Sequence, residues 1–170
     1  MKNKCVFLDR DGVINEDNPD YVYKPESFHL ISGVVDAVTK LKGAGYLIIV
    51  VTNQSGIAKG LYTREEMDAC HELMQKELGH QVDYIYYAPF HESISNSLSR
   101  KPGSLMFERA IARFDIDPKN SWMIGDKARD IVPAKKLGIR TIQVGGLNDG
   151  VADYISQDLN TASSVILRAD

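Results

Sequence analysis

Residues 5–12 read CVFLDRDG, and this stretch decides how the rest of the chain is interpreted. Its first four residues are apolar and end at polar ones, which is typical of a short buried strand. Two aspartates, Asp9 and Asp11, follow directly, and Gly12 permits a tight turn after them. Their spacing lets both carboxyls reach one pocket, with Arg10 directed away from it.

Short apolar runs alternate with longer amphipathic runs along the chain. Strands are predicted at residues 5–8, 46–51, 82–87, 122–124 and 139–144, and a last one around 165–167. Helices are predicted at residues 33–44, 63–78, 105–114 and 128–137. The second helix begins with a capping box formed by Thr63 and Glu66. This alternation predicts an α/β fold, with a doubly wound, mainly parallel, Rossmann-like sheet covered by helices on both faces.

Composition and charge limit the class of protein. The chain has 170 residues, of which 44% are hydrophobic and 25% charged, and this fits a single domain over residues 1–170. With a net charge of −3 and no basic stretch, nucleic acid is not an expected partner. The two cysteines are far apart, and no apolar run is long enough for a signal peptide or a membrane span. We therefore expect a cytoplasmic protein without membrane contact.

Three more polar clusters lie after predicted strands or before a predicted helix. They are TNQSG at residues 52–56, RKPG at 100–103 and GDKARD at 125–130. Ligands bind at the carboxyl ends of the strands in a sheet of this kind, so we expect these clusters to meet the first aspartate pair in one site. Each cluster by itself also fits a solvated turn or a helix cap.

The acidic residues of these clusters suit phosphoryl transfer. An ionised aspartate attacks phosphorus without a base to activate it, and a second carboxyl can protonate the leaving oxygen. Asp9 and Asp11 offer this pair. Together with Asp126 and Asp130 they form an oxygen-rich site that suits Mg²⁺.

The donors and cations of the clusters suit the anionic parts of a substrate. Thr52 and its polar neighbours offer hydroxyl and amide groups to phosphate oxygens. Lys101 can neutralise charge on a phosphoryl group as it develops, and Arg100 can hold a distal group of the substrate.

In this order and at successive strand ends, the four clusters resemble the motifs of the haloacid dehalogenase-like phosphohydrolases. The resemblance covers roughly residues 4–145. The matching residues are Asp9, Asp11, Thr52, Lys101, Asp126 and Asp130. The resemblance implies a Mg²⁺-dependent phosphatase of the capless type, because the segments between the motifs leave no room for a large cap.

The same resemblance implies a role for each residue. Asp9 attacks phosphorus and forms an aspartyl-phosphate, while Asp11 acts first as the acid and then as the base. Thr52 positions the transferring group and Lys101 offsets its charge. The implied Mg²⁺ ligands are Asp9, the backbone carbonyl of Asp11, and Asp126, with Asp130 nearby or bound through water.

Three longer runs narrow the resemblance. FLDRDGVIN at residues 7–15, VTNQSGIA at 51–58 and RKP at 100–102 are similar to the D-glycero-D-manno-heptose 1,7-bisphosphate 7-phosphatases, enzymes of cell-surface polysaccharide precursor synthesis. The expected partner is a phosphorylated sugar, and the expected state is a monomer. Expected substrate contacts, from pocket walls at residues 14–24 and 88–100 and from the strand end, are Asn15, Asp17, Tyr21, Asn53, Gln54, Ser55 and Arg100.

One segment departs from the pattern of these relatives. Many of them hold a structural zinc with CPHH after the third strand and CxC before RKP, but here residues 88–91 read APFH and residues 97–99 read SLS. His91 alone does not supply the four nitrogen or sulfur ligands that zinc prefers. We therefore expect no zinc and a loop ordered by packing or by its own hydrogen bonds.

Two other functions fit parts of the pattern. Histidinol-phosphatases, or phosphatases of another small ester, share the same machinery, and a cationic substrate would use acids such as Glu16, Asp17, Asp20 and Glu92 in the pocket walls. A signalling module with a phosphorylated aspartate also places acids on a doubly wound sheet. In such receivers, however, that aspartate follows a later strand than the first.

Overall fold

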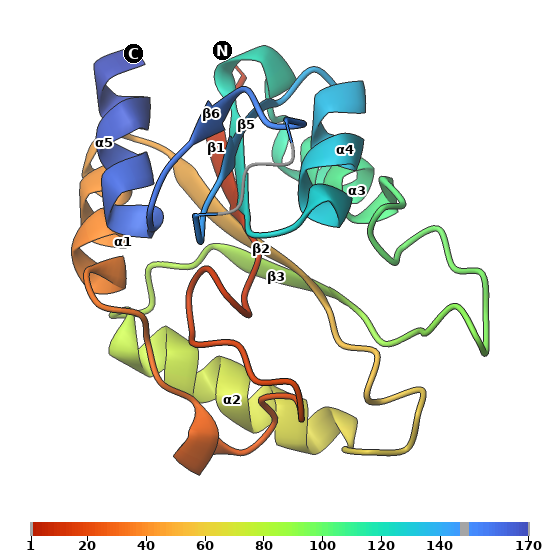
Figure 1. Cartoon of the computed structure of the whole chain (residues 1–170). Helices are drawn as coiled ribbons and strands as arrows, with labels where there is room; N and C mark the ends of the chain where they lie inside the picture. The colour runs from red at the N-terminus through yellow and green to blue at the C-terminus, as the bar shows by residue number, and fades with distance from the viewer. Residues whose placement is uncertain (1, 147–149, 170) are drawn as a thin grey trace.

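The computed structural model describes residues 2–146 and 150–169. Six strands form one parallel sheet in the order β3-β2-β1-β4-β5-β6 (Figure 1). The strands are β1 (Cys5–Leu8), β2 (Leu47–Asn53), β3 (Tyr84–Ala88), β4 (Trp122–Gly125), β5 (Arg140–Gln143) and β6 (Tyr154–Ile155). The helices are α1 (Val34–Gly43), α2 (Arg64–Glu77), α3 (Leu105–Phe114), α4 (Ala128–Lys136) and α5 (Leu159–Ala169), with short 3-10 turns η1 (Pro25–Ser27) and η2 (Pro118–Asn120). None of the helices in the described ranges has the length and apolar character needed to cross a lipid bilayer.

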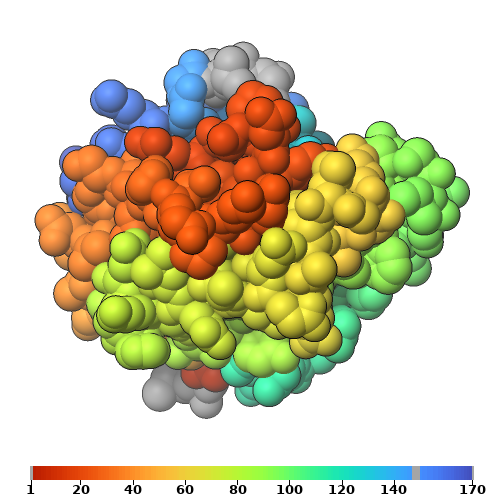
Figure 2. Space-filling model, turned by 90° about the horizontal axis from the view of Figure 1, so that it is seen from below, coloured from red at the N-terminus to blue at the C-terminus, as the bar shows by residue number. Residues whose placement is uncertain are grey.

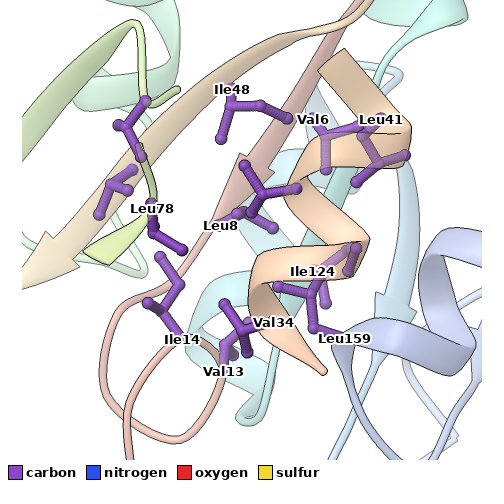
Figure 3. Packing of buried hydrophobic residues seen from close by; sticks show 14 of the residues in the cluster. Val6, Leu8, Val13, Ile14, Val34, Leu41, Ile48, Leu78, Ile124 and Leu159 are labelled. Atoms are coloured by element: carbon purple, nitrogen blue, oxygen red, sulfur yellow. The ribbon is translucent and has the colours of Figure 1, made fainter. Parts of the chain in front are cut away.

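Side chains of β1 alternate between two apolar clusters, one on each face of the sheet. Val6 and Leu8 pack with residues of α1 and α5, among them Leu41 and Leu159 (Figure 3). On the opposite face, Cys5 and Phe7 belong to a cluster with residues of α3 and α4. A strand buried on both faces is apolar at every position, which is why residues 5–8 show no polar alternation.

The predicted elements agree with the structure over most of the chain. The strand at residues 5–8 and the helix at 105–114 occupy the predicted residues, and the other main elements differ from the predictions by one or two residues at their ends. The capping box of α2 is confirmed, because the backbone N–H of Glu66 donates to the Thr63 hydroxyl at 3.2 Å and that of Thr63 donates to the Glu66 carboxylate at 2.8 Å.

The predicted strand at residues 165–167 is wrong. These residues lie within α5, whose buried side chains Leu159, Ala162 and Ile166 recur at helical spacing and pack beside α1. The sixth strand is instead β6, a two-residue strand with exposed side chains. A segment of two residues is too short to give a periodic signal in the sequence.

The sheet order places the ends of three strands together. β1 lies in the middle, with Leu8 in register with Val50 of β2 and Ile124 of β4. From β1 the chain continues to β2 on one side, and from β4 it continues to β5 on the other, and parallel α/β sheets bind ligands at such a point. The loop at residues 10–32 spreads across this end of the molecule beside the segment that follows β2 (Figure 2).

Candidate active site

Three carboxylates meet beyond the ends of β1 and β4. One carboxylate oxygen from each of Asp9, Asp126 and Asp130 lies within 4.8 Å of the other two. Asp9 follows β1, Asp126 follows β4, and Asp130 belongs to the first turn of α4. Gly125 permits this close approach, since a Cβ atom there would lie 2.3 Å from the Cβ of Asp130. The structure thus brings together three of the four acidic residues predicted from the sequence.

Lys101 is fully buried between two of these carboxylates. Its Nζ lies 2.9 Å from Oδ1 of Asp9 and 2.7 Å from Oδ1 of Asp130, and it donates to the carbonyl of Val51 at 2.7 Å. Burial alone would lower the pKa of Lys101, but the charges of Asp130 and Asp9 outweigh it and raise that pKa. The side chain is therefore a fixed ammonium group against the two acids.

The acidic cluster carries more negative charge than Lys101 balances. With every group ionised, Asp9, Asp126, Asp130 and Lys101 have a formal charge of −2. Burial and the charge of Asp130 accordingly raise the pKa of Asp9 to about 6, and burial and the charge of Asp9 raise the pKa of Asp126. Oδ1 of Asp126 is buried and has no hydrogen-bond partner among the described residues. These features fit a hard divalent cation such as Mg²⁺, which prefers a few carboxylates and neutralises them.

Asn53 fixes the backbone of Lys101. Its amide donates to the Lys101 carbonyl at 3.0 Å, and its carbonyl oxygen accepts from the Lys101 N–H at 2.9 Å. Both polar groups of the Asn53 side chain are thus engaged with Lys101, and its role as a substrate contact stays a prediction.

The carboxylate of Asp11 lies outside the three-acid cluster and is held by donors of its own. Asn15 donates to Oδ1 at 3.0 Å, and Gln54 donates to Oδ2 at 3.1 Å. Arg10 also contacts Asp11, at 2.9 Å, a contact that the sequence did not predict. A buried guanidinium needs partners, and Arg10 finds them in this carboxylate and in the carbonyl of Val22.

The end of β2 and the residues after it form a buried hydrogen-bonded chain. Gln54 donates to the hydroxyl of Thr52 at 3.0 Å and accepts from the hydroxyl of Tyr62 at 2.7 Å. Because Gln54 also bonds to Asp11, it links the first two motifs of the sequence. Tyr62 was not predicted as part of the site, and its place in the sequence, eight residues beyond Gln54, gives no local signal for it.

A pocket of about 290 Å³ opens beside this buried floor. Its lining residues are Asp11, Asp17, Asn18, Pro19, Tyr21, Val22, Asn53, Gln54, Ser55, Lys59, His91, Arg100, Lys127 and Arg129. Six of the seven predicted substrate contacts are in this set. The seventh, Asn15, is buried behind the pocket against Asp11.

Four cationic side chains line the pocket, and only Arg100 was predicted. Lys59, Lys127 and Arg129 were missed, although each lies within four residues of a motif that the sequence shows. Two of the missed lysines have internal partners. Lys59 donates to the Tyr21 hydroxyl at 2.9 Å, and Lys127 contacts carboxylate oxygens of Asp17 at 2.9 Å and Asp126 at 3.1 Å.

The loop that carries zinc in many relatives is closed here by hydrogen bonds. The hydroxyls of Ser97 and Ser99, at two of the former cysteine positions, lie 2.8 Å apart. Arg100 spans the loop and donates to the carbonyl of Phe90 at 3.2 Å. Hydrogen bonds within the loop therefore order it, as predicted, and they join Ser97 to Ser99 and Arg100 to Phe90.

A central strand that ends in an aspartate, a hydroxyl after the neighbouring strand, a buried lysine and a second acidic group define a hydrolase of the haloacid dehalogenase-like class. The comparisons with known proteins agree. A HAD-hydrolase-like family model matches residues 98–162. The chain is 38% identical to D-glycero-beta-D-manno-heptose-1,7-bisphosphate 7-phosphatase from Haemophilus influenzae, over 98% of both chains. It is 34% identical to the corresponding alpha-anomer enzyme from Burkholderia mallei, over 99% of this chain and 90% of that one.

A solved structure shows the same likeness. The D,D-heptose 1,7-bisphosphate phosphatase from B. bronchiseptica, complexed with magnesium and phosphate, is 28% identical and superimposes with a TM-score of 0.89, covering 98% of this chain and 99% of that one. The chain is a phosphatase and belongs to the family of heptose-1,7-bisphosphate 7-phosphatases.

Proposed function

We propose that the protein is a Mg²⁺-dependent phosphatase that removes the 7-phosphate of a D-glycero-D-manno-heptose 1,7-bisphosphate. The observation that carries this proposal is the pairing of two unlike sites. A buried floor of three carboxylates and Lys101 suits one phosphate with its metal, and an adjoining pocket lined by four cations suits a second phosphate.

Asp9 is the nucleophile in this proposal. The N–H of Arg10 and the ammonium of Lys101 both hold Oδ1 of Asp9, at 2.8 Å and 2.9 Å. Among the described residues none is bonded to Oδ2, so this oxygen attacks phosphorus. An Asp9 aspartyl-phosphate forms as the bond from phosphorus to the sugar oxygen breaks.

Asp11 moves the protons. Protonated Asp11 gives its proton to the departing sugar oxygen, and the resulting carboxylate takes a proton from the water that hydrolyses the aspartyl-phosphate. Phosphate and free Asp9 are the products. Arg10, Asn15 and Gln54 all contact the Asp11 carboxylate and fix its position beside the site.

The acidic cluster would hold Mg²⁺. Asp9 and Asp126 supply carboxylate oxygens, together with the backbone carbonyl of Asp11. Asp130 lies further back, since its two oxygens are engaged by Lys101 and by the N–H of Lys127 at 3.1 Å. When bound, the cation offsets negative charge on the phosphoryl group. Lys101, which contacts Asp9, would offset part of the same charge.

The pocket supports a bisphosphate over histidinol phosphate. A substrate with a cationic distal end would need unpaired acids in the walls. Of Glu16, Asp17, Asp20 and Glu92, only Asp17 lines the pocket, and it is paired with Lys127. The four cations favour an anionic distal group instead.

Phosphate release tests the proposal. Heptose 1,7-bisphosphate, in both anomers, and histidinol phosphate are supplied at matched concentrations, each with Mg²⁺ and with EDTA. We expect rapid release from the bisphosphate with Mg²⁺ and almost none with EDTA. Preference for histidinol phosphate would overturn the substrate but keep the mechanism, and release that EDTA leaves unchanged would overturn the metal site.

The same proposal includes a cytoplasmic, monomeric enzyme of a single domain. Cys5 and Cys70 are both buried free thiols, which fits a reducing compartment. Sedimentation at several protein concentrations tests the oligomeric state, and a mass near 18.9 kDa at all of them is expected.

A further inference from the structure

The four cations of the pocket differ in how they are used. Lys59 donates to a tyrosine hydroxyl, Lys127 lies between two carboxylates, and Arg100 donates to a backbone carbonyl. Arg129 has no hydrogen bond or ion pair among the described residues. It is the pocket cation whose charge is not already committed within the described part of the chain.

Burial makes this lack of partners costly. The Nε of Arg129 is buried and has no acceptor among the described residues, although the side chain lines an open pocket. A buried donor without a partner loses its hydration and gains nothing in return. A ligand with several acceptor oxygens would restore what is lost.

Helix stability does not explain the residue either. Arg129 is the second residue of α4, and Asp130 is the third. The start of a helix carries partial positive charge, which favours acids and disfavours cations there. Helix stability therefore does not account for an arginine at this position, whereas ligand binding in the pocket that it lines does.

We propose that Arg129 is a specificity-determining residue that binds the distal anionic group of the substrate. This rests on the proposed function, because it assumes that a second phosphate enters the pocket while the first lies at Asp9. The planar guanidinium matches a phosphate with two parallel hydrogen bonds. Arg129 reaches that phosphate from the α4 side, and Arg100 reaches it from the loop before α3.

Steady-state kinetics with paired substrates test this role. Heptose 1,7-bisphosphate and fructose 1,6-bisphosphate supply a distal phosphate, and p-nitrophenyl phosphate lacks one. In Arg129→Gln we expect kcat/KM to fall about tenfold or more for the preferred bisphosphate, mainly through KM, and about twofold at most for the monoester. Arg129→Lys keeps the charge but not the planar guanidinium with its paired donors, and we expect its kcat/KM for the bisphosphate to lie between those of Arg129→Gln and the wild type.

A matched control separates the site from general charge effects. Arg168 is an exposed arginine in the last turn of α5, far along the chain from every motif, and Arg168→Gln should lose neither activity. Thermal unfolding of Arg129→Gln should match the wild type or exceed it, since the change removes a cation from a helix start.

The outcomes separate the two proposals. Equal losses on bisphosphate and monoester would overturn the role of Arg129 and leave the heptose substrate intact. A wild type that prefers fructose 1,6-bisphosphate would overturn the heptose substrate, and the ratio for that sugar would then decide the role of Arg129. If the wild-type protein hydrolyses bisphosphates and the monoester with equal kcat/KM, both the heptose substrate and the role of Arg129 are overturned.

Discussion

The buried floor of the site and the exposed wall of its pocket each contain a Lys–Asp ion pair, and the two pairs differ in burial. On the floor, Lys101 and Asp130 are both wholly buried, with 2.7 Å between their charged atoms. On the wall, Lys127 and Asp17 are 40% and 46% exposed, at a similar distance of 2.9 Å. The floor is attached to strand ends and one helix start, while Asp17 lies in the long loop after β1.

This difference separates chemistry from recognition. A buried pair cannot exchange partners cheaply, because each charge left alone would lose both water and its neighbour. An exposed pair is worth little and gives way to a better ligand. The buried pair therefore fixes the geometry at the reacting atoms. The exposed pair leaves the charge around the distal group of the substrate adjustable.

The largest expected effect concerns the nucleophile on the floor. Asp9→Asn keeps the shape of the side chain and an oxygen for Lys101, but removes the nucleophile. We expect phosphate release to fall about 10⁴-fold or more, with circular dichroism unchanged. Asp36→Asn, an exposed acid in α1, is the control. Activity within tenfold of the wild type would contradict the mechanism.

The stability of the two pairs gives the next test. In EDTA, Lys101→Met leaves Asp9 and Asp130 buried without their cation, and we expect a loss of about 3–5 kcal/mol in the free energy of unfolding. Lys127→Met breaks the exposed pair and should cost about 1 kcal/mol or less. Urea denaturation measures both, and similar costs would remove the distinction between floor and wall.

A buried polar group away from the site shows what burial does without partners. The sequence suggests a surface position for His71, but the side chain is only 7% exposed and its Nε2 has no partner among the described residues. Burial and the charge of Arg10 lower the pKa of His71 to about 3. The unfolded chain takes up this proton near pH 6.5 and the folded chain does not, so stability falls as the pH drops below 6.5.

His71→Leu should remove this dependence. At pH 5 the wild type is expected to lose about 2 kcal/mol through this group relative to pH 7, and the variant to lose that much less. His80→Asn is a matched control at an exposed position with positive φ, which asparagine tolerates. Equal slopes of stability against pH in wild type and His71→Leu would show that the imidazole is not buried as described.

The smallest expected effect lies on the wall. Asp17→Asn releases Lys127 from its acidic partner and removes a negative charge from the pocket lining, so the KM for the bisphosphate should fall about two- to fivefold. The change for p-nitrophenyl phosphate should be smaller. Asp20→Asn, in the same loop but outside the pocket, is the control. A rise in KM would mean that Asp17 itself contacts the substrate.

The sequence predicted the floor better than the wall. Asp9, Lys101 and Asp126 follow or precede regular elements, and a parallel sheet brings strand ends together whatever the loops do. Lys127 and Arg129 lie at the start of α4, but Lys59 and Asp17 reach the pocket on loops, and no period in the sequence records how these loops fold. The hydrogen bonds that Asn53 and Asn15 make to other residues of the site are likewise not recorded by any period in the sequence.

The C-terminal helix illustrates a second limit. The run VIL at residues 165–167 fits a strand by composition, but its neighbours Leu159 and Ala162 complete a helical face against α1. A short apolar run is ambiguous until the surface it packs against is known.

The position of β1 in the sheet has a consequence for synthesis on the ribosome. β1 is made first, yet its second neighbour, β4, begins only at Trp122. Until β4 has been made, one edge of β1 is open to strands of other nascent chains. The three carboxylates of Asp9, Asp126 and Asp130 likewise meet only after the chain has been made as far as Asp130.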